Sequence, residues 1–273
     1  MASPSSVRIR PIPPDRGRIT AIGWLRIAVR VFALLMALAL CFPLHFLWGL
    51  SRRPSPWPRR FFAMAAWIAG LRLHVHGRVY DGPCCHLANH VSWLDILVVG
   101  AATGTSFVSK AEVQSIPLIG ALANLNRTVY VQRNDRLGVG DQIDVIRAAM
   151  ERGQRVTLFP EGTTTGGRAL LPFKSSLLKV LENPPADLMV QPVFLDYGPN
   201  SAAMAWVGEE HGLDNALRML SALKAWPVTV HLLAPFDPED FADRKAIAAA
   251  AHRALSDALD RVAPSGHAPN GDV

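Results

Sequence analysis

Ala88-Asn89-His90-Val91-Ser92-Trp93-Leu94-Asp95 is the stretch around which the rest of the chain is organised. The apolar run Gly82–Leu87 before it is short enough for a buried strand, and Ser92 can begin a helix. We therefore expect a strand, a turn and a helix, with His90 in the turn at the carboxyl end of the strand. Open α/β sheets bind their ligands at that edge.

His90 and Asp95 carry the first chemical signal. A neutral imidazole can take a proton near neutral pH, and a carboxylate can hold its other ring nitrogen. Five residues on an ideal helix turn through about 140°, so the two side chains meet only if His90 precedes the helix. The structural alternative is a capping box, in which Ser92 and Asp95 satisfy backbone groups at the helix start. The spacing alone leaves both interpretations open.

A second polar stretch follows a predicted strand at Arg155–Phe159. It reads Pro160-Glu161-Gly162-Thr163-Thr164-Thr165-Gly166-Gly167. Proline, glycine and threonine favour a turn. Backbone N–H groups and hydroxyls in such a loop can also bind an oxyanion or a phosphate. The stretch predicts either a turn or an anion-binding loop.

Four segments together resemble the glycerolipid acyltransferases, the family typified by 1-acyl-sn-glycerol-3-phosphate acyltransferase. Asn89–Asp95 is similar to the family's NHxSxxD motif, and Phe159–Thr164 is similar to its FPEGT motif. Thr128–Arg133 resembles the segment that ends in a phosphate-contacting arginine, and Val190–Val193 resembles the later V-x-P-V segment. All four occur in the family's order.

The resemblance implies acyl transfer without an acyl-enzyme, with His90 and Asp95 as the catalytic residues. His90, oriented by Asp95, would take the proton from a hydroxyl of the acceptor lipid. That oxygen would then attack the carbonyl of an acyl thioester, and the tetrahedral oxyanion would need backbone or hydroxyl donors.

The resemblance also implies a set of substrate-binding residues. Arg133 would grip a phosphate in a forked geometry, although a solvated surface arginine is the structural alternative. Glu161, Gly162 and Thr163 would help to position the headgroup, and Gly162–Thr163 would supply oxyanion donors. Glu161 cannot itself attract phosphate, so it would orient a donor or contact a hydroxyl. Lys110 would lie near the phosphate, or else simply end a strand in solvent.

The implied reaction needs no metal or redox cofactor, only acyl-coenzyme A or acyl-acyl-carrier protein as donor. With 1-acyl-sn-glycerol-3-phosphate as acceptor, the product would be phosphatidic acid for phospholipid biosynthesis. The alternative acceptor is lyso-ornithine lipid or another lysophospholipid, because Leu171–Leu177 and the long C-terminal region also resemble the lyso-ornithine lipid branch.

Composition favours a membrane-associated enzyme. Half of the 273 residues are hydrophobic, and the formal net charge is +6. A basic chain can bind nucleic acid, an anionic membrane or an anionic substrate. Many arginines flank the N-terminal apolar segment, which favours a membrane, and no nucleic-acid motif is present. Three cysteines without metal-ligand spacing predict buried thiols and a catalytic domain that faces a reducing cytoplasm.

The N-terminal region predicts a membrane anchor. Val31–Leu50 is almost wholly apolar and long enough to cross the hydrocarbon core, which is about 30 Å thick. Pro43 predicts a kink or a re-entrant turn in it, and Phe61–Leu73 suits a helix lying in the interface. Arginines on both sides leave the topology open, and a buried helical hairpin is the alternative.

The domain organisation follows from these segments. We expect a disordered basic arm at 1–21, the membrane-associated helical segment at 22–73, the acyltransferase domain at 74–262 and a disordered tail at 263–273. The fold class is α/β, with a mostly parallel mixed sheet flanked by helices. Pro192 predicts an edge or irregular strand, and Pro238–Val262 predicts a long helix.

Two other function classes remain open from the sequence. A hydrolase could use the same histidine on water, although no G-x-S-x-G elbow is present. A membrane adaptor without catalytic activity would have the same fold, and His90→Ala would then cause no loss of lipid turnover.

Overall fold

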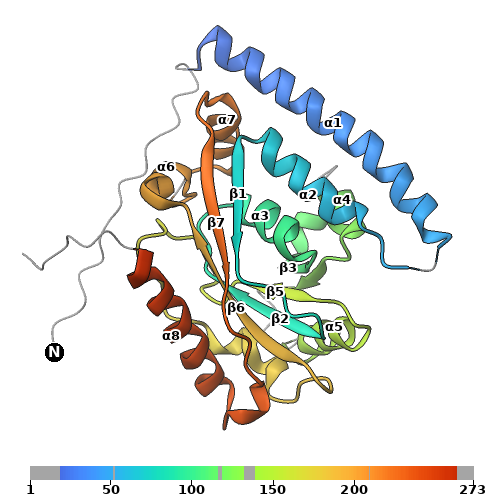
Figure 1. The fold of residues 1–273 in the computed structure, drawn as a ribbon, viewed down its shortest axis with the longest axis vertical. Helices are drawn as coiled ribbons and strands as arrows, with labels where there is room; N and C mark the ends of the chain where they lie inside the picture. Colours follow the sequence, from blue (N-terminus) through green and yellow to red (C-terminus); the bar gives the residue numbers. More distant parts are fainter. Residues whose placement is uncertain (1–18, 52, 116–118, 132–138, 209, 263–273) are drawn as a thin grey trace, which may run out of the picture.

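The computed structural model describes residues 19–51, 53–115, 119–131, 139–208 and 210–262. The predicted arm and tail therefore lie almost wholly outside the described residues. The described part is a sheet covered on both faces by helices, with a long N-terminal helix along one side (Figure 1).

The sheet has seven strands in the described residues, in the order β1-β7-β6-β2-β5-β3-β4. Every neighbouring pair is parallel except β6 and β7, which run antiparallel. The predicted mostly parallel mixed sheet is confirmed. The strands are β1 (Leu71–His76), β2 (Cys84–Ala88), β3 (Ser106–Lys110), β4 (Val129–Val131), β5 (Val156–Leu158), β6 (Met189–Asp196) and β7 (Trp226–Leu232).

Helices bury the two faces of the sheet in separate apolar clusters. The helices are α1 (Ala21–Gly49), α2 (Trp57–Ile68), α3 (Leu94–Thr103), α4 (Ile119–Leu125), α5 (Val139–Glu151), α6 (Ser201–Met204), α7 (Gly212–Ser221) and α8 (Arg244–Val262). Side chains of α2, α3 and α7 form one cluster with the sheet, and side chains of α5 and α8 form a second. A small third cluster joins Leu255 and Ala258 of α8 to Phe194 of β6. Parallel sheets are typically covered on both faces in this way.

Strand β2 lies at the centre of the sheet, and all five of its residues are buried. Cys84 and Cys85 are free thiols, as predicted, and burial raises the pKa of Cys84 to about 12. They pack as small apolar side chains. The strand delivers the next residues, Asn89 and His90, at its carboxyl end.

One local prediction was half right and another was wrong. Pro192 lies in β6, which is paired on both sides, so it is not in an edge strand. The predicted irregularity is present, because Val193 pairs with Leu232 whereas Val190 bridges Phe236, one residue out of that register. The antiparallel ladder with β7 begins only at Val193, and the carbonyl of Pro192 accepts the N–H of Leu233, so the missing proline donor is tolerated there. The C-terminal helix begins at Arg244 instead of Pro238, because Asp243 accepts backbone N–H bonds from the first helical turn.

The N-terminal region forms one long helix and one short one. α1 runs unbroken from Ala21 to Gly49 with Pro43 inside it, so the predicted re-entrant turn is absent from this helix. α2 follows at Trp57–Ile68, and the sheet begins at Leu71, inside the range given to the membrane-associated segment.

Candidate active site

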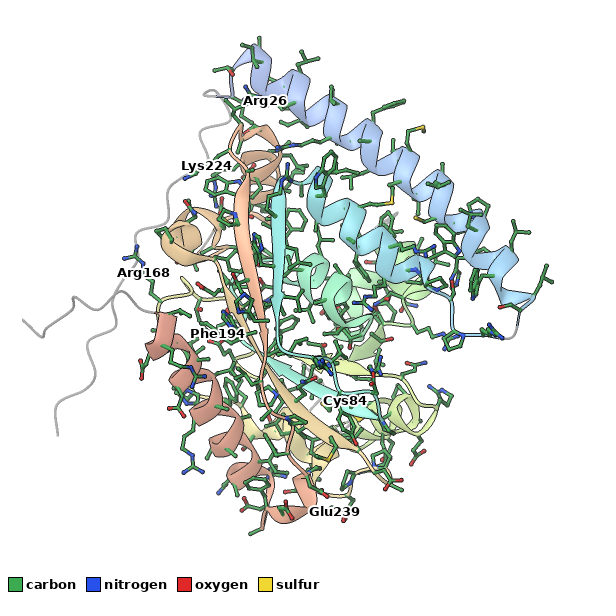
Figure 2. The ribbon with its side chains drawn as sticks, viewed as in Figure 1. Arg26, Cys84, Arg168, Phe194, Lys224 and Glu239 are labelled. Carbon is green, nitrogen blue, oxygen red and sulfur yellow. The ribbon has the colours of Figure 1, made fainter. Side chains whose placement is uncertain are left out.

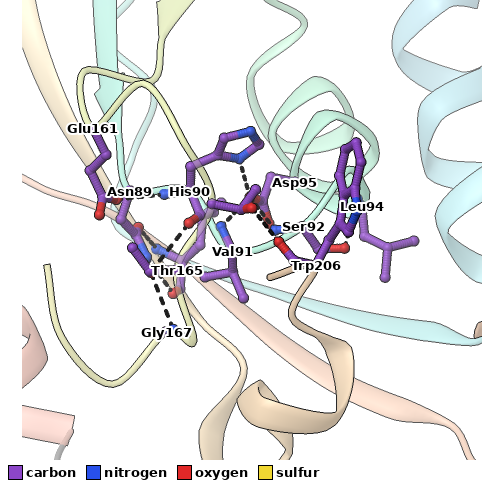
Figure 3. Close-up of polar contacts among 12 residues, drawn as sticks. Asn89, His90, Val91, Ser92, Leu94, Asp95, Glu161, Thr165, Gly167 and Trp206 are labelled. Carbon is purple, nitrogen blue, oxygen red and sulfur yellow. Dashed lines mark hydrogen bonds and ion pairs between the residues drawn. The ribbon is translucent and has the colours of Figure 1, made fainter. Parts of the chain in front are cut away.

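The sharp turn between β2 and α3 brings His90 and Asp95 together. The Nδ1 atom of His90 lies 2.7 Å from Oδ2 of Asp95 (Figure 3). The Asp95 side chain is fully buried, whereas one fifth of the His90 side chain is exposed. His90 lies in the turn, before the helix, which is the placement that the sequence required for the pair to meet.

Asp95 accepts hydrogen bonds from four donors. Its Oδ2 also takes the backbone N–H of Val91 at 2.7 Å and of Ser92 at 2.9 Å. Its Oδ1 takes the hydroxyl of Tyr197, which is buried behind it. The contact with the Ser92 N–H is one half of the predicted capping box, and the Ser92 hydroxyl accepts the Leu94 N–H at 3.5 Å rather than that of Asp95.

These contacts assign the proton on His90. The two backbone amides can only donate, so Asp95 is the acceptor and Nδ1 carries the hydrogen. The other ring nitrogen, Nε2, is then left with its lone pair. This arrangement can take a proton from a hydroxyl and stabilise the imidazolium that forms.

The loop that follows β5 packs against the same turn. The ring of Phe159 stacks on the His90 ring, with centroids 4.2 Å apart and planes 21° apart. The carbonyl of His90 accepts the backbone N–H of Thr165 at 2.8 Å and its hydroxyl at 3.3 Å (Figure 3). The stretches Asn89–Asp95 and Phe159–Thr165 therefore build one site at the carboxyl ends of β2 and β5, which are adjacent parallel strands.

The buried side chain of Glu161 links this loop to the His90 turn through backbone hydrogen bonds. Its Oε1 accepts the His90 backbone N–H at 2.8 Å, and its Oε2 accepts the Leu171 backbone N–H at 2.9 Å. Only 1% of the residue is exposed. Burial raises the pKa of Glu161, and the two N–H donors oppose that effect. Both carboxylate oxygens are thus engaged by the backbone.

Gly162 shows why this loop needs glycine. It has a φ of +70°, and a Cβ placed there would lie 2.8 Å from Nζ of Lys174. Any other residue would be strained and would displace the lysine. Thr163, beside it, is exposed.

The remaining predicted site residues are only partly described. Arg133 lies outside the described residues. Lys110 is the last residue of β3, and its side chain is not described. The described residues contain no group of three or more metal-ligating side chains.

The sequence patterns missed residues 197–218, a segment that forms hydrogen bonds with the turn after β2 and with the loop after β5. The backbone N–H of Trp206 donates to the Val91 carbonyl at 3.0 Å, and the Trp206 carbonyl accepts the hydroxyl of Thr164. Asn215 Oδ1 accepts the indole N–H of Trp93 at 2.9 Å. Residues 197–218 carried no motif, so only the tertiary contacts identify them.

An ion pair with a buried carboxylate and a partly exposed arginine links residues of that segment. Arg218 contacts Glu210 through Nε and Nη2, each at 3.0 Å, and Asn215 Nδ2 donates to Glu210 at 2.7 Å. The forked geometry satisfies both carboxylate oxygens, which a buried carboxylate requires.

Comparison with known proteins agrees with this geometry. A family model described as Acyltransferase matches residues 72–196. The chain is 32% identical to a lyso-ornithine lipid O-acyltransferase of Rhodobacter capsulatus over 258 residues, which are 89% of this chain and 93% of that protein. It is 37% identical to one of Rhizobium meliloti over 185 residues, 64% of this chain and 63% of that protein.

Proteins named 1-acyl-sn-glycerol-3-phosphate acyltransferase are also similar to this chain. A 1-acyl-sn-glycerol-3-phosphate acyltransferase of Neisseria gonorrhoeae is 30% identical over 189 residues, 68% of this chain and 72% of that protein. The crystal structure of the 1-acyl-sn-glycerophosphate acyltransferase PlsC from Thermotoga maritima superimposes with a TM-score of 0.62 at 17% identity, covering 90% of this chain and all of that one. That likeness shows the shared fold.

The sequence-based predictions of the family and of an acyltransferase are confirmed by a family model that spans both motifs and by relatives matched along most of their length. The chain belongs to the acyltransferase family.

Proposed function

We propose that this protein transfers a fatty acyl group from a thioester to the free hydroxyl of a lysolipid, with lyso-ornithine lipid as the acceptor. The single observation that carries the chemistry is the His90–Asp95 pair at the carboxyl end of a central parallel strand. The acceptor is taken from the relatives of that name, one of which is matched over 93% of its length. 1-Acyl-sn-glycerol-3-phosphate is the second acceptor, on the strength of the Neisseria relative.

In the proposed reaction His90 Nε2 takes the proton of the acceptor hydroxyl. The oxygen attacks the thioester carbonyl, the tetrahedral oxyanion collapses, and the thiol leaves with the proton held by His90. Asp95 stabilises the imidazolium between these steps. Donors for the oxyanion would come from the Gly162–Thr163 part of the loop.

Headgroup binding is proposed for Lys110, the last residue of β3, and for Arg133, which comes after β4 in the sequence and lies outside the described residues. Arginine grips either phosphate or carboxylate in a forked geometry. Lyso-ornithine lipid carries a carboxylate and no phosphate, so the same arginine suits both acceptors. The donor is an acyl-acyl-carrier protein or an acyl-coenzyme A, and the reaction requires no metal or redox group.

The membrane is the proposed location of the enzyme, with the catalytic domain in the cytoplasm. α1 is long and apolar enough to cross a bilayer by length and composition. Its inner face, however, packs on α2 and α7: Gly23, Ile27, Ala37 and Cys41 are buried. Its outer face exposes large apolar side chains, among them Leu25, Phe32, Leu35, Phe46 and Leu47.

Two arginines support a helix that lies along the membrane surface rather than across it. Arg30 Nη1 donates to the Met219 and Leu220 carbonyls at 3.1 and 2.9 Å. Arg26, which is labelled on α1 in Figure 2, donates through Nη1 to the Ser221 carbonyl at 3.2 Å. These bonds cap the end of α7 and tie α1 to the catalytic domain. The outer apolar face would then sit among the lipids of one leaflet.

The test incubates the protein in detergent or vesicles with labelled acyl-acyl-carrier protein or acyl-coenzyme A and a panel of lysolipids. His90→Ala is the paired control. Histidine-dependent ornithine lipid supports the proposal. Phosphatidic acid that forms with wild type but not with His90→Ala supports acyl transfer and identifies 1-acyl-sn-glycerol-3-phosphate as the acceptor instead. Free fatty acid released without an acceptor indicates a hydrolase. No acylation with either donor overturns the proposal and favours the adaptor.

A further inference from the structure

Tyr197 touches the proposed catalytic pair from a part of the chain beyond the family motifs. It follows directly after β6, where the family model ends at residue 196. Its ring is 1% exposed, and its hydroxyl donates to Oδ1 of Asp95. The tyrosine is 102 residues away from Asp95 along the chain, so the contact depends on the sheet, which places the ends of β6 and β2 side by side.

The two oxygens of Asp95 are held in different ways. Oδ2 has three donors, which are His90 Nδ1 and the N–H groups of Val91 and Ser92. Tyr197 is the donor that the structure gives to Oδ1. A buried carboxylate oxygen without a donor is costly, and a carboxylate fixed at both oxygens cannot rotate.

The chemistry of Tyr197 suits a permanent donor. Burial and the neighbouring Asp95 raise the pKa of Tyr197 well above its usual value. The hydroxyl therefore stays protonated throughout the range in which a histidine base works. In the described part of the chain Glu161 is the other acidic residue in contact with His90, and its oxygens accept backbone N–H groups rather than the imidazole N–H.

We propose that Tyr197 is a positioning residue, which holds Asp95 in the orientation that keeps His90 Nε2 directed at the acceptor hydroxyl. The inference rests on the proposed role of His90 as the base. Tyr197 also balances part of the Asp95 charge, and so tunes how strongly that carboxylate stabilises the imidazolium.

The test compares Tyr197→Phe with wild type in kcat, KM and the pH dependence of kcat/KM. Phenylalanine keeps the volume and removes only the hydroxyl. We expect kcat to fall about tenfold with KM little changed, a fraction of what a general base contributes. We also expect the acid limb of the kcat/KM profile to move up by about half a pH unit or more, because a less balanced Asp95 charge favours the imidazolium.

Four further variants complete the experiment: Tyr80→Phe, Asp95→Asn, the double variant of Asp95→Asn with Tyr197→Phe, and His90→Ala. Tyr80→Phe removes a hydroxyl from a partly exposed tyrosine packed over Gly82 and should leave kcat and the profile unchanged. Tyr197→Phe added to Asp95→Asn should cost little more than Asp95→Asn alone, since the two residues act as one unit. His90→Ala tests the proposed function itself.

The outcomes separate the two proposals. Full activity of His90→Ala overturns the proposed function. An inactive His90→Ala together with a wild-type rate and acid limb in Tyr197→Phe overturns only the positioning role. The positioning role is also overturned if Tyr197→Phe lowers kcat without moving the acid limb and lowers kcat by the same factor in the Asp95→Asn variant. Tyr197 would then contribute only packing.

Discussion

The imidazole Nδ1 of His90 and the carboxylate Oδ2 of Asp95 lie 2.7 Å apart, although the two residues would face different sides of a single helix. The contact forms because His90 remains in the turn after β2 while Asp95 enters the first turn of α3. The same aspartate holds the backbone of Val91 and Ser92, so the turn and the pair are fixed together.

Substitution of either partner should abolish acyl transfer without unfolding the protein. His90→Ala removes the base and should lower kcat at least about 10³-fold, and Asp95→Asn should lower it by about 10² to 10⁴-fold. Initial rates with a thioester donor measure the effect. His74→Ala, at an exposed position on β1, is the matched control. Near-normal rates in His90→Ala would contradict the mechanism.

Glu161→Gln should act through the backbone of His90. Glutamine offers one acceptor oxygen where Glu161 uses two, so one buried N–H loses its partner. We expect a loss of about 1–3 kcal/mol in the free energy of unfolding and a fall in kcat. Glu151→Gln, at an exposed glutamate, is the control. Unchanged stability with a raised KM would instead give Glu161 a direct contact with the acceptor.

The burial of His86 predicts that the folded protein loses stability at acid pH. It is fully buried in β2, neither ring nitrogen has a hydrogen-bond partner, and burial lowers its pKa to about 3. The unfolded chain takes up this proton near pH 6.5, whereas the folded chain takes it up only near pH 3. Stability from this residue is therefore present above pH 6.5 and lost as the pH falls towards 3, by roughly 3 kcal/mol at pH 4.

Denaturant unfolding between pH 4 and 8 checks the effect of His86. His86→Leu should lose less stability on acidification than wild type, because leucine takes up no proton. His74→Leu, at an exposed position on β1, should follow the wild-type curve. Identical pH slopes for His86→Leu and wild type would refute this assignment.

Asn215→Ala should destabilise the segment that supports the active site. The side chain joins the Trp93 indole to Glu210, and both are left without that partner in alanine. We expect a loss of about 2 kcal/mol or more in the free energy of unfolding. Asn200→Ala removes only an exposed contact with Lys224 and should be nearly neutral. Equal melting temperatures for the two variants would count against the network.

The outer face of α1 should determine membrane binding. Leu25 and Phe32 are each 63% exposed and lie two turns apart on that face. Replacing each with glutamate should weaken binding to vesicles about tenfold, because charge in the interface opposes insertion of the apolar face. Val145→Glu, on α5 away from α1 (Figure 1), should bind normally. Flotation with vesicles measures the difference, and unaffected binding of Phe32→Glu would contradict the model of the anchor.

The sequence by itself determined the local elements of the site. The apolar run before His90 and the turn chemistry at Pro160–Gly167 predicted two strands that each end in a functional loop, and both are present. Such features are local, because a buried strand needs only a few consecutive apolar residues and a turn needs only particular backbone angles. The mostly parallel sheet followed from strands that alternate with helices.

Tertiary structure alone decided which distant residues complete the site. Tyr197, Trp206 and Asn215 reach the His90 turn from segments more than 100 residues away and carry no pattern of their own. The sequence could not choose between an edge strand and an irregular interior strand at Pro192 for the same reason: whether a strand tolerates proline depends on where the ladder of its neighbour begins. Hydrogen-bond pairing between remote segments is set by the packing of the sheet and its helices, which short-range sequence patterns do not encode.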